Sequence, residues 1–453
     1  MIKKYLDKIS GKKALIMAIL AMAAPAIIEM GLNTILGVAD MIMIGQMIGS
    51  GAIASVGFSN QIMYFLIFTF SAFNTGAVAM ISRAHGEKDF DKMKRIAEQN
   101  VVLNLLMGLG VMGFAFLFRT EIFKIYDIEP KVFDDALIYF DYILIGFVPM
   151  FLSFAFASIL RGSGDTKTPM WITGFANLLN IAGNYVLISG WSIFPEMGIG
   201  GAALSTSLSR IGALCIYIYV LYVKNTDIKL KAKWFIDKHI LSPLFRISLP
   251  GGIEQFFMQL SFLVVGVFIS QLDTNSESLF RILIQIESLS FMPAVGISIA
   301  AATLVGKSLG EKNIQKASEI GATSSILGIL WGIFVGIIFV VVPLPLLYAF
   351  TTDQIVISLG IPVMIYMALN QPGLNYMIVM GGALRGAGDT YKLMLYTMVR
   401  LWGLFVPLSY LFILILEQGV AGLWQAEIVS ILATALIIFR RFHSRKWALL
   451  TLN

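Results

Sequence analysis

The sequence predicts an all-helical membrane protein with twelve spans, arranged as two homologous lobes of six helices each. Hydrophobic residues make up 58% of the 453 and charged residues 13%, whereas soluble domains average roughly 45–50% and about 25%. A soluble fold of this length could not bury so much apolar surface. An internal repeat and a one-sided distribution of Lys and Arg predict the lobes and their orientation.

Three short motifs occur twice in the chain at nearly the same separation. The pairs are Pro25 with Glu29 and Pro250 with Glu254, then Gly86-Glu87-Lys88 and Gly310-Glu311-Lys312, then Arg161-Gly-Ser-Gly-Asp-Thr and Arg385-Gly-Ala-Gly-Asp-Thr. Their offsets of 225, 224 and 224 residues indicate an internal duplication. We expect an N-terminal six-helix lobe over residues 1–223, a cytoplasmic connector over 224–242 and a C-terminal six-helix lobe over 243–453. Duplicated halves of membrane transporters commonly hold a solute site between them.

Twelve apolar stretches are long enough to cross a bilayer, which takes about 20 residues. Those of the first lobe are 14–44, 52–82, 96–118, 136–158, 168–190 and 198–223. Those of the second are 243–271, 279–306, 319–342, 355–380, 391–415 and 419–441. The first and seventh are longer than the bilayer is thick, so they must tilt or bend. Pro25 and Pro250 predict the bends, because proline removes a backbone hydrogen bond.

The positive charges predict the orientation. With both termini inside, the cytoplasmic segments hold 27 of the 33 Lys and Arg, and the opposite loops hold three, Arg119, Lys124 and Lys131. Cytoplasmic loops of membrane proteins carry such an excess. The net charge of +6 therefore reflects topology, and we expect no nucleic-acid partner. The basic, apolar N-terminus resembles a secretory signal, but residues 25–29 recur at 250–254, so we expect the first span to be retained.

Motifs of catalysis were sought and are absent from the sequence. It has no phosphate-binding Gly-x-x-x-x-Gly-Lys-Ser/Thr loop and no His-Glu-x-x-His helix. A single cysteine, Cys215, excludes disulfides within the chain and a cysteine metal site. We expect no cofactor and no enzymatic activity, with energy drawn from an ion gradient or a separate partner. The Arg161 motif is interpreted as a tight turn in which Asp165 can cap the next helix.

Ionisable residues within spans are functional candidates, because each costs at least ~2.5–3.5 kcal/mol to place at mid-bilayer. Asp40 in the first span is the strongest. Asn180 and Asn184 are four residues apart and share one face of the fifth span, and Thr206 lies at a similar depth in the sixth. A carboxylate with amide and hydroxyl oxygens suits a proton or Na⁺. The alternative is hydrogen bonding that only joins helices.

The second lobe offers a different set of polar residues. Glu254 follows Pro250 by one helical turn, and with Gln255 and Glu287 it could form an acidic site or a cavity wall that favours cationic solutes. Alternatively, Glu254 and Glu287 pair with Arg281 or Arg400 to hold helices together. Asp40 has no acidic counterpart 224 residues later, so the lobes share a scaffold without sharing this site.

Several of these motifs together resemble the multidrug and toxic compound extrusion (MATE) family over essentially the whole chain. They are Pro25 with Val38-Ala39-Asp40, the run from Leu160 to Thr166, the run from Glu287 to Pro293, and Gly306 to Gly310. The resemblance implies a V-shaped pair of lobes and cation-coupled export of amphipathic, often cationic compounds. It also implies a bacterial or archaeal cytoplasmic membrane, with both termini in the cytoplasm.

The resemblance carries over to particular positions. Asp40, Asn180 and Thr206 match the family's cation site in the N-terminal lobe, and Glu254 matches an acid that some members use in the C-terminal lobe. Asn184 stands where several prokaryotic members have Asp. Asn370 and Gln371 replace the acid that one branch pairs with the Glu254 position, so the N-terminal site is favoured.

The expected function is therefore H⁺- or Na⁺-coupled antiport by alternating access, exporting small amphipathic or cationic organic solutes across the lipid bilayer. We expect a monomer. The main alternative is a flippase for lipid-linked sugars or another large amphiphile, which predicts a long basic groove. An enzyme within the membrane would need a nucleophile or metal set that the spacing does not supply, and a channel would conduct without gating.

Overall fold

The computed structural model describes residues 2–124, 128–191, 193–224, 229–230 and 236–450. Every regular element in these ranges is a helix, which confirms the all-helical prediction. The chain forms two compact units. The N-terminal unit is Ile28–Arg246, and the C-terminal unit combines the chain up to Ile27 with the chain from Ile247 onward. The predicted lobe of residues 1–223 places the whole first helix in the N-terminal lobe, whereas this helix is shared by both units.

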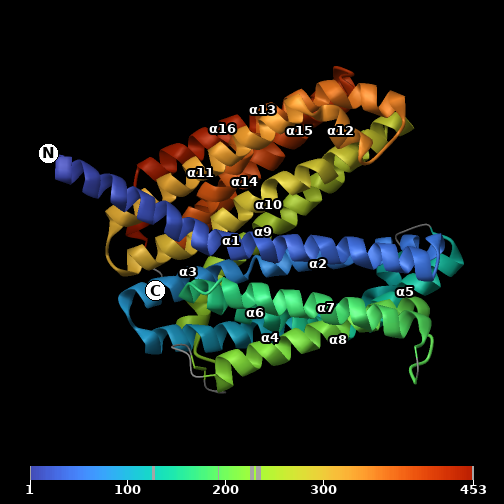
Figure 1. Cartoon of the computed structure of the whole chain (residues 1–453), viewed down its shortest axis with the longest axis horizontal. Coiled ribbons are helices and arrows are strands. Elements are labelled where there is room, and N and C mark those ends of the chain that lie inside the picture. Colours follow the sequence, from blue (N-terminus) through green and yellow to red (C-terminus); the bar gives the residue numbers. More distant parts are fainter. Residues whose placement is uncertain (1, 125–127, 192, 225–228, 231–235, 451–453) are drawn as a thin grey trace. The chain divides into compact units, whose positions relative to one another are not determined.

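The N-terminal unit is a bundle built around α7 and α8. Its helices are the second part of α1 (Ile2–Met47), α2 (Ser50–Ser71), α3 (Asn74–Glu87), α4 (Phe90–Lys124), α5 (Pro130–Ile145), α6 (Phe147–Ser163), α7 (Lys167–Ser189) and α8 (Gly198–Ile218), which continues as a π-helical turn, η1 (Tyr219–Val223). α7 packs along α8, α6 lies against α3 and α4, and α5 contacts α2 and α8 (Figure 1). Phe123, Phe140 and Phe147 are fully buried in its core.

The C-terminal unit is organised around one central helix. Its elements are α9 (Lys238–Ile269), α10 (Thr274–Gly310), α11 (Ile314–Val341), α12 (Pro343–Tyr348), α13 (Gln354–Gly386), α14 (Thr390–Met398), η2 (Val399–Phe405), α15 (Val406–Tyr410), η3 (Leu411–Ile415), α16 (Gly419–His443) and a 3₁₀ turn, η4 (Lys446–Leu449). α13 packs against α10, α11 and α16. Leu283, Phe405 and Trp424 belong to its core.

The helices bear out a multi-pass membrane protein. In the described ranges ten helical stretches are long and apolar enough to cross a membrane, and α5 with α6, which meet at 48°, form an eleventh crossing. The remaining predicted span corresponds to α7, whose 23 residues exceed the length needed. Large apolar side chains face outward, with Leu117 and Leu178 exposed by 76% and 68%, as expected for helices that contact lipid.

The break between α5 and α6 falls at Gly146 for a steric reason. A Cβ at this position would lie 3.0 Å from the Cα of Ser207 on α8, closer than real Cβ atoms pack. Ser207 also binds this corner, because its hydroxyl donates to the carbonyl of Tyr142 at 2.7 Å. The close approach to α8 therefore requires glycine where the helix changes direction.

The internal repeat is visible in the turns as well as in the sequence. Lys88 and Lys312 have φ values of 58° and 57°, so both turns place a lysine in the left-handed conformation. The next helix then starts in the same way, since the backbone N–H of Lys92 donates to Asp89 Oδ1 at 2.9 Å and that of Lys316 donates to Asn313 Oδ1 at 2.9 Å. Ion pairs of 3.0 and 2.8 Å close the turns, Lys92 with Glu87 and Lys316 with Glu311.

Capping carboxylates start several helices. Asp273 accepts from the backbone N–H groups of Asn275 and Ser276 at the start of α10. Its pKa is lowered from the usual value, first because the Ser276 hydroxyl donates to it and also because of these backbone donors. In the other lobe, Asp165 accepts from the backbone N–H of Lys167 and of Thr168, both at 3.0 Å. The predicted cap at Asp165 is confirmed.

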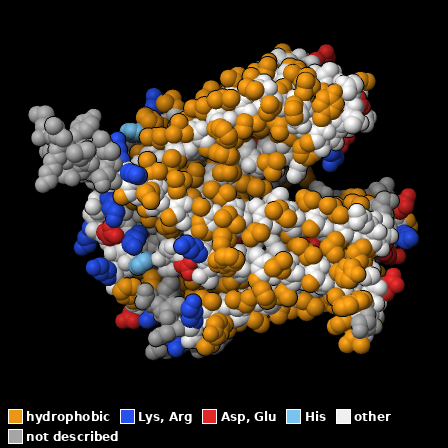
Figure 2. All heavy atoms as spheres, viewed as in Figure 1, with side chains coloured by type: hydrophobic (Ala, Val, Ile, Leu, Met, Phe, Trp, Pro, Cys, Tyr) orange, Lys and Arg blue, Asp and Glu red, His pale blue; other side chains and the backbone are white. Residues whose placement is uncertain are grey.

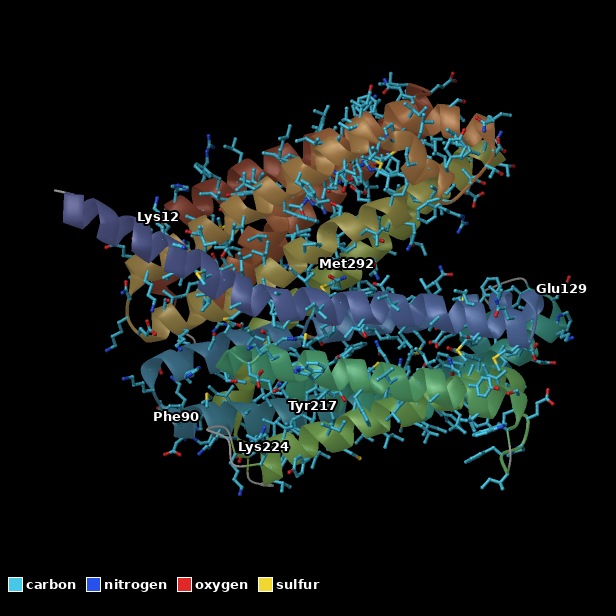
Figure 3. The ribbon with its side chains drawn as sticks, in the orientation of Figure 1. Lys12, Phe90, Glu129, Tyr217, Lys224 and Met292 are labelled. Carbon is cyan, nitrogen blue, oxygen red and sulfur yellow. The ribbon has the colours of Figure 1, made fainter. Side chains whose placement is uncertain are left out.

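Charges separate along the N-terminal unit. Lys and Arg gather at the end of this unit that carries the α3–α4 turn, while hydrophobic side chains cover the long sides of its helices (Figure 2). Phe90 and Lys224 lie at that end, and Glu129 lies at the other (Figure 3). The unit therefore has a basic end and an apolar belt, as the distribution of charges in the sequence predicts.

Candidate functional site

The four residues predicted as a cation site meet in the N-terminal unit. Nδ2 of Asn184 on α7 donates to Oδ1 of Asp40 on α1 at 2.6 Å. The Asn180 amide is satisfied at both ends when its Nδ2 donates to Asp40 Oδ1 at 2.7 Å and its oxygen accepts from the Thr206 hydroxyl on α8 at 2.9 Å. Asn180 and Asn184 are 0% and 1% exposed. We call these four residues the Asp40 cluster.

Glycines and a serine set the distance between α7 and α8. A Cβ on Gly201 would lie 2.6 Å from the carbonyl carbon of Leu187, so only glycine lets the two backbones come this close. Ser205 donates its hydroxyl to the carbonyl of Asn180 at 2.7 Å. This contact fixes the register that places Thr206 opposite Asn180.

A buried arginine lies near the cluster. Arg210 is one helical turn after Thr206 on α8, so the two side chains share a face. Its positive charge interacts electrostatically with Asp40, Tyr64 and Tyr139, and its Nη1 is buried without a hydrogen-bond partner. Asp40 therefore has a permanent cation in its surroundings, which the sequence analysis did not place there.

Glu29 and Glu254, the two glutamates that follow the repeated prolines, are both held by arginines. Nη2 of Arg161 donates to Oε1 of Glu29 at 2.7 Å, and Thr173 adds a hydroxyl at 3.3 Å. In the C-terminal unit the same contacts recur: Arg385 donates to Glu254 at 2.7 Å, and Thr397 donates to it at 3.0 Å. The pairs are equivalent under the internal repeat. The interpretation of Glu254 as an ion-pair partner has support, but Arg385 is its partner, and the suggested Arg281 bonds Glu277 at 2.6 Å.

Glu287 has a hydrogen-bonding environment of its own in the C-terminal unit. Its Oε1 accepts from Gln371 Nε2 at 3.1 Å, and its Oε2 accepts from the indole N–H of Trp424 at 3.3 Å. Gln371 in turn accepts from the Ser290 hydroxyl. Glu254 and Glu287 thus bind different partners on different helices, and the hydrogen bonds of the described residues do not join them into one acidic site.

Two further predicted positions have simple placements. Gln255 is half-buried on α9. Pro25 and Pro250 are buried inside the continuous helices α1 and α9, so any bend at them leaves the helix unbroken. The bends remain a prediction.

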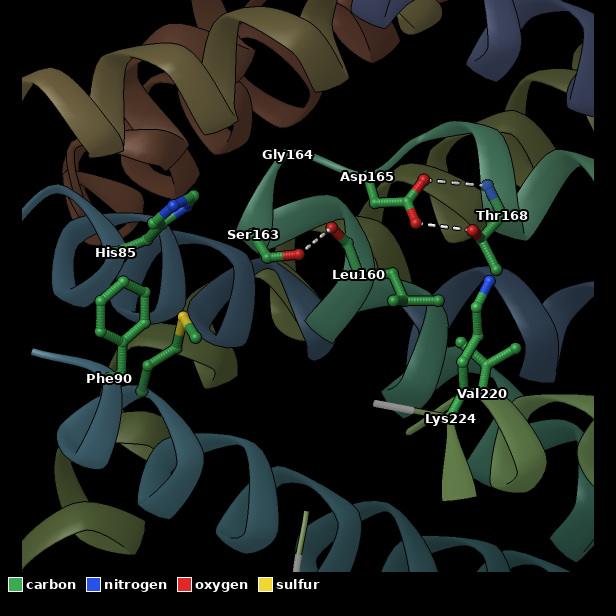
Figure 4. A pocket seen from close by; sticks show the side chains of 10 residues that line it. His85, Phe90, Leu160, Ser163, Gly164, Asp165, Thr168, Val220 and Lys224 are labelled. Carbon is green, nitrogen blue, oxygen red and sulfur yellow. Dashed lines mark hydrogen bonds between the residues drawn. The ribbon is translucent and has the colours of Figure 1, made fainter. Parts of the chain in front are cut away.

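The N-terminal unit also has a cavity at its basic end, of about 360 Å³. It lies beside the α6–α7 turn, where Asp165 bonds Thr168 and the Ser163 hydroxyl donates to the carbonyl of Leu160 (Figure 4). His85 and Lys224 also line it. None of its lining residues belongs to the Asp40 cluster, so the two are separate features.

The sequence analysis missed the partners of the carboxylates more than the carboxylates themselves. Arg161 and Arg385 were interpreted as parts of a turn, although each motif recurs at the same offset as the glutamate it binds. That shared offset was the available signal. Glu427 and Arg400 were noted only as intramembrane charges, and the sequence has no short-range pattern that links them to Glu287.

Comparison with known proteins bears on the family. The MatE family model matches the chain twice, over residues 25–186 and 250–411, which is well over half of its length. The chain belongs to the MatE family. The two matches are offset by 225 residues, as in the repeat found in the sequence, and the suggested resemblance is confirmed. Like other MatE proteins, it is a membrane transporter and not an enzyme.

Relatives within the MatE family match nearly the full chain. A probable multidrug resistance protein NorM from Thermotoga maritima is 33% identical over 435 residues, covering 95% of this chain and 92% of the relative. An uncharacterized transporter YisQ from Bacillus subtilis is 28% identical and covers 93% of each chain.

Solved structures support the MatE fold independently. A multidrug resistance MATE family transporter of the MOP superfamily in an outward-facing conformation superposes with a TM-score of 0.88 at 20% identity, covering 95% of this chain and 96% of the other. A MOP superfamily transporter from Pyrococcus furiosus superposes with a TM-score of 0.87 at 20% identity, covering 94% and 95%. At these identities the likeness shows the fold alone.

Proposed function

We propose that this MatE protein is a proton-coupled antiporter that exports amphipathic, often cationic drugs by alternating access. The observation that carries the proposal is the Asp40 cluster, in which a carboxylate inside a membrane helix is surrounded by buried amides from α7. Family membership and the likeness to a probable multidrug resistance protein support the class of substrate. An intramembrane carboxylate of this kind is the usual mark of an ion pathway.

The atoms that face Asp40 favour H⁺ over Na⁺. Na⁺ is bound by several oxygen atoms, but the Asn184 amide, and the Asn180 amide in its satisfied orientation, turn N–H groups toward the carboxylate. The nearby charge of Arg210 opposes a second cation, whereas a proton neutralises the carboxylate and takes no space. We therefore assign the coupling step to protonation of Asp40.

Export then follows from mutual weakening of two bound species. Protonation of Asp40 from outside removes the charge that accepts the two amide N–H bonds, so the packing of α1 against α7 changes. If this change lowers drug affinity, drug binding must lower proton affinity by the same factor. The inward proton gradient can then drive the drug outward.

The test is dye efflux from proteoliposomes with a pH gradient and a Na⁺ gradient imposed separately. Wild type should export ethidium with the pH gradient alone, and Asp40→Asn should lower that rate at least about tenfold, because an amide cannot release a proton. Asp141→Asn is the matched control, since this carboxylate of the same unit is 44% exposed and pairs with Arg119. It should export at the wild-type rate.

Three results would contradict parts of the proposal. Export driven only by Na⁺ would overturn the choice of proton. Wild-type export by Asp40→Asn together with loss of export in Glu254→Gln would move the coupling site to the C-terminal unit. No dye transport under either gradient would overturn drug export itself.

A further inference from the structure

The C-terminal unit contains buried charges that the proposed function does not use. Near the middle of its helices, Glu254 is neutralised by Arg385 at 2.7 Å. Three ionisable groups remain there among the described residues: Glu287 on α10, Arg400 on η2 and Glu427 on α16. Two carboxylates thus share one arginine. If both were ionised, this interior would carry a net negative charge, which a low-dielectric environment strongly disfavours.

The geometry brings the two carboxylates to one place. The indole N–H of Trp424 bonds Glu287 at 3.3 Å, and Trp424 lies three residues before Glu427, so both project from the same face of α16. Glu287 and Glu427 interact electrostatically. Arg400 is only 7% exposed, and the charged groups that it faces are Glu427 first and Glu254 second.

An unpartnered amide lies beside both carboxylates. Asn370 on α13 is 2% exposed, and neither its Nδ2 nor its Oδ1 has a hydrogen-bond partner. Its side chain interacts with Glu287 and with Glu427. A protonated carboxyl offers a donor to the amide oxygen, and the other, ionised carboxylate offers an acceptor to the amide nitrogen. One proton on the pair would therefore satisfy both ends of Asn370.

We propose that Glu287 and Glu427 form a carboxyl pair that holds one exchangeable proton, with Arg400 compensating the charge of the ionised partner. Two carboxyl groups in one buried site share a proton because both cannot ionise together. The groups that bond Glu287 are N–H donors, from Gln371 and Trp424, which suit a carboxyl pair and not a metal cation. Arg400 lies in a π-helical segment, a distortion often found at functional sites.

Infrared difference spectroscopy of the full chain in lipid vesicles tests this pair directly. The carbonyl band of a protonated carboxyl is recorded between about pH 5 and about pH 9, the range in which perturbed carboxyl groups titrate. The parent is Asp40→Asn, so the N-terminal cluster contributes nothing and failure of the proposed function is distinguished from failure of this inference. We expect a titrating band in this parent.

The variants identify the groups. Adding Glu287→Gln or Glu427→Gln should abolish the band, because one carboxylate then balances Arg400. Adding Arg400→Gln should increase it about twofold, because both carboxyls must then be neutral. Glu277→Gln is the matched control on α10, where the carboxylate pairs with the exposed Arg281, and it should leave the band unchanged.

The opposite results are equally clear. No band in the Asp40→Asn parent would overturn the proposal without any change in the pair itself. A band that survives either glutamine substitution would show that the proton is not shared. A band that is displaced by Na⁺ but not by choline would show a metal cation site instead.

Discussion

Glu29 and Glu254 are each bound by an arginine that is 132 or 131 residues away in sequence. The glutamates are 7% exposed, so each would be an uncompensated buried charge without its arginine. The arginines begin the Arg-Gly-x-Gly-Asp-Thr turns, which therefore join α6 to α1 and α13 to α9. The two ion pairs tie the prolines' helices into their units in the same way.

A double-mutant cycle on each pair should measure this tie. We expect Arg161→Met or Glu29→Leu alone to lower the free energy of unfolding by roughly 2–4 kcal/mol, since Arg161 retains 26% side-chain exposure and the full penalty for a buried pair is about 3–5 kcal/mol. The double variant should lose less than the sum, with a coupling energy of about 1–3 kcal/mol. Denaturation in detergent monitored by circular dichroism provides the measurement.

The repeat offers the control for this cycle. Glu254 and Arg385 have the same 2.7 Å contact and similar exposure, 9% and 29%, so their coupling energy should agree with that of the first pair. Additive single and double variants in both lobes would show that the pairs hold no folding energy.

Residue-level prediction succeeded where neighbours in space are neighbours on one helix. Asn180 and Asn184 could be assigned to one face from their spacing, and Asp40 was singled out because an intramembrane acid needs partners. Arg210 escaped because nothing local to α8 shows that its side chain faces Asp40. The breaks in symmetry escaped as well: Asp165 caps α7, whereas its repeat counterpart Asp389 bonds Arg441 at 2.7 Å.

At the scale of helices, α7 and α8 position the Asp40 cluster through close backbone contact. Gly201 lies against the carbonyl group of Leu187, and Gly183 lies against the side chain of Ser205. A methyl group at either contact must push the helices apart. Such a shift would separate Asn180 from Thr206, which are joined across this interface.

Gly201→Ala should therefore destabilise the protein by about 1–3 kcal/mol and also lower efflux. Gly57→Ala on α2 is the matched substitution, because a Cβ there meets no atom within 4 Å. It should stabilise α2 by up to about 1 kcal/mol and leave efflux intact. Thermal unfolding and dye efflux measured on the same preparations test both effects. Equal melting temperatures for the two variants would show that the α7–α8 contact tolerates a methyl group.

Span positions were more predictable than span shapes. The apolar stretches at 52–82, 136–158 and 391–415 each correspond to a crossing. However, the first is divided between α2 and α3, the second bends at Gly146, and the third contains two π-helical segments, η2 and η3. Hydropathy measures only length and apolarity. The breaks depend on tertiary contacts, such as Ser207 against Gly146.

At the scale of the whole molecule, duplication supplies the scaffold and asymmetry supplies the chemistry. Both lobes keep the left-handed lysine turn and the Glu–Arg–Thr contacts. Only the N-terminal unit has an acid at the position of Asp40, and only the C-terminal unit combines two carboxylates with one buried arginine. α1 and α9 each belong to both units, and each changes unit within four residues of its proline. These two helices are therefore where relative motion of the units must be absorbed.

The proposed orientation, with both termini in the cytoplasm, can be tested with single cysteines. Cys215 is exposed, so Cys215→Ala is the starting chain. Asp91→Cys and Gln315→Cys lie 224 residues apart in equivalent turns of the two lobes, while Lys131→Cys and Thr352→Cys lie at the opposite ends of the helices. All four native side chains are exposed. An impermeant maleimide added to intact cells should label only the last two.

The repeat makes this labelling test self-consistent. Because each lobe has an even number of spans, equivalent turns must lie on the same side of the membrane, so Asp91→Cys and Gln315→Cys must agree whatever the orientation. Permeabilising the cells should expose both and supplies the control for reactivity. Labelling of these two in intact cells, with protection of Lys131→Cys and Thr352→Cys, would reverse the topology. Disagreement within an equivalent pair would instead contradict twelve spans, because one lobe would then cross the membrane an odd number of times.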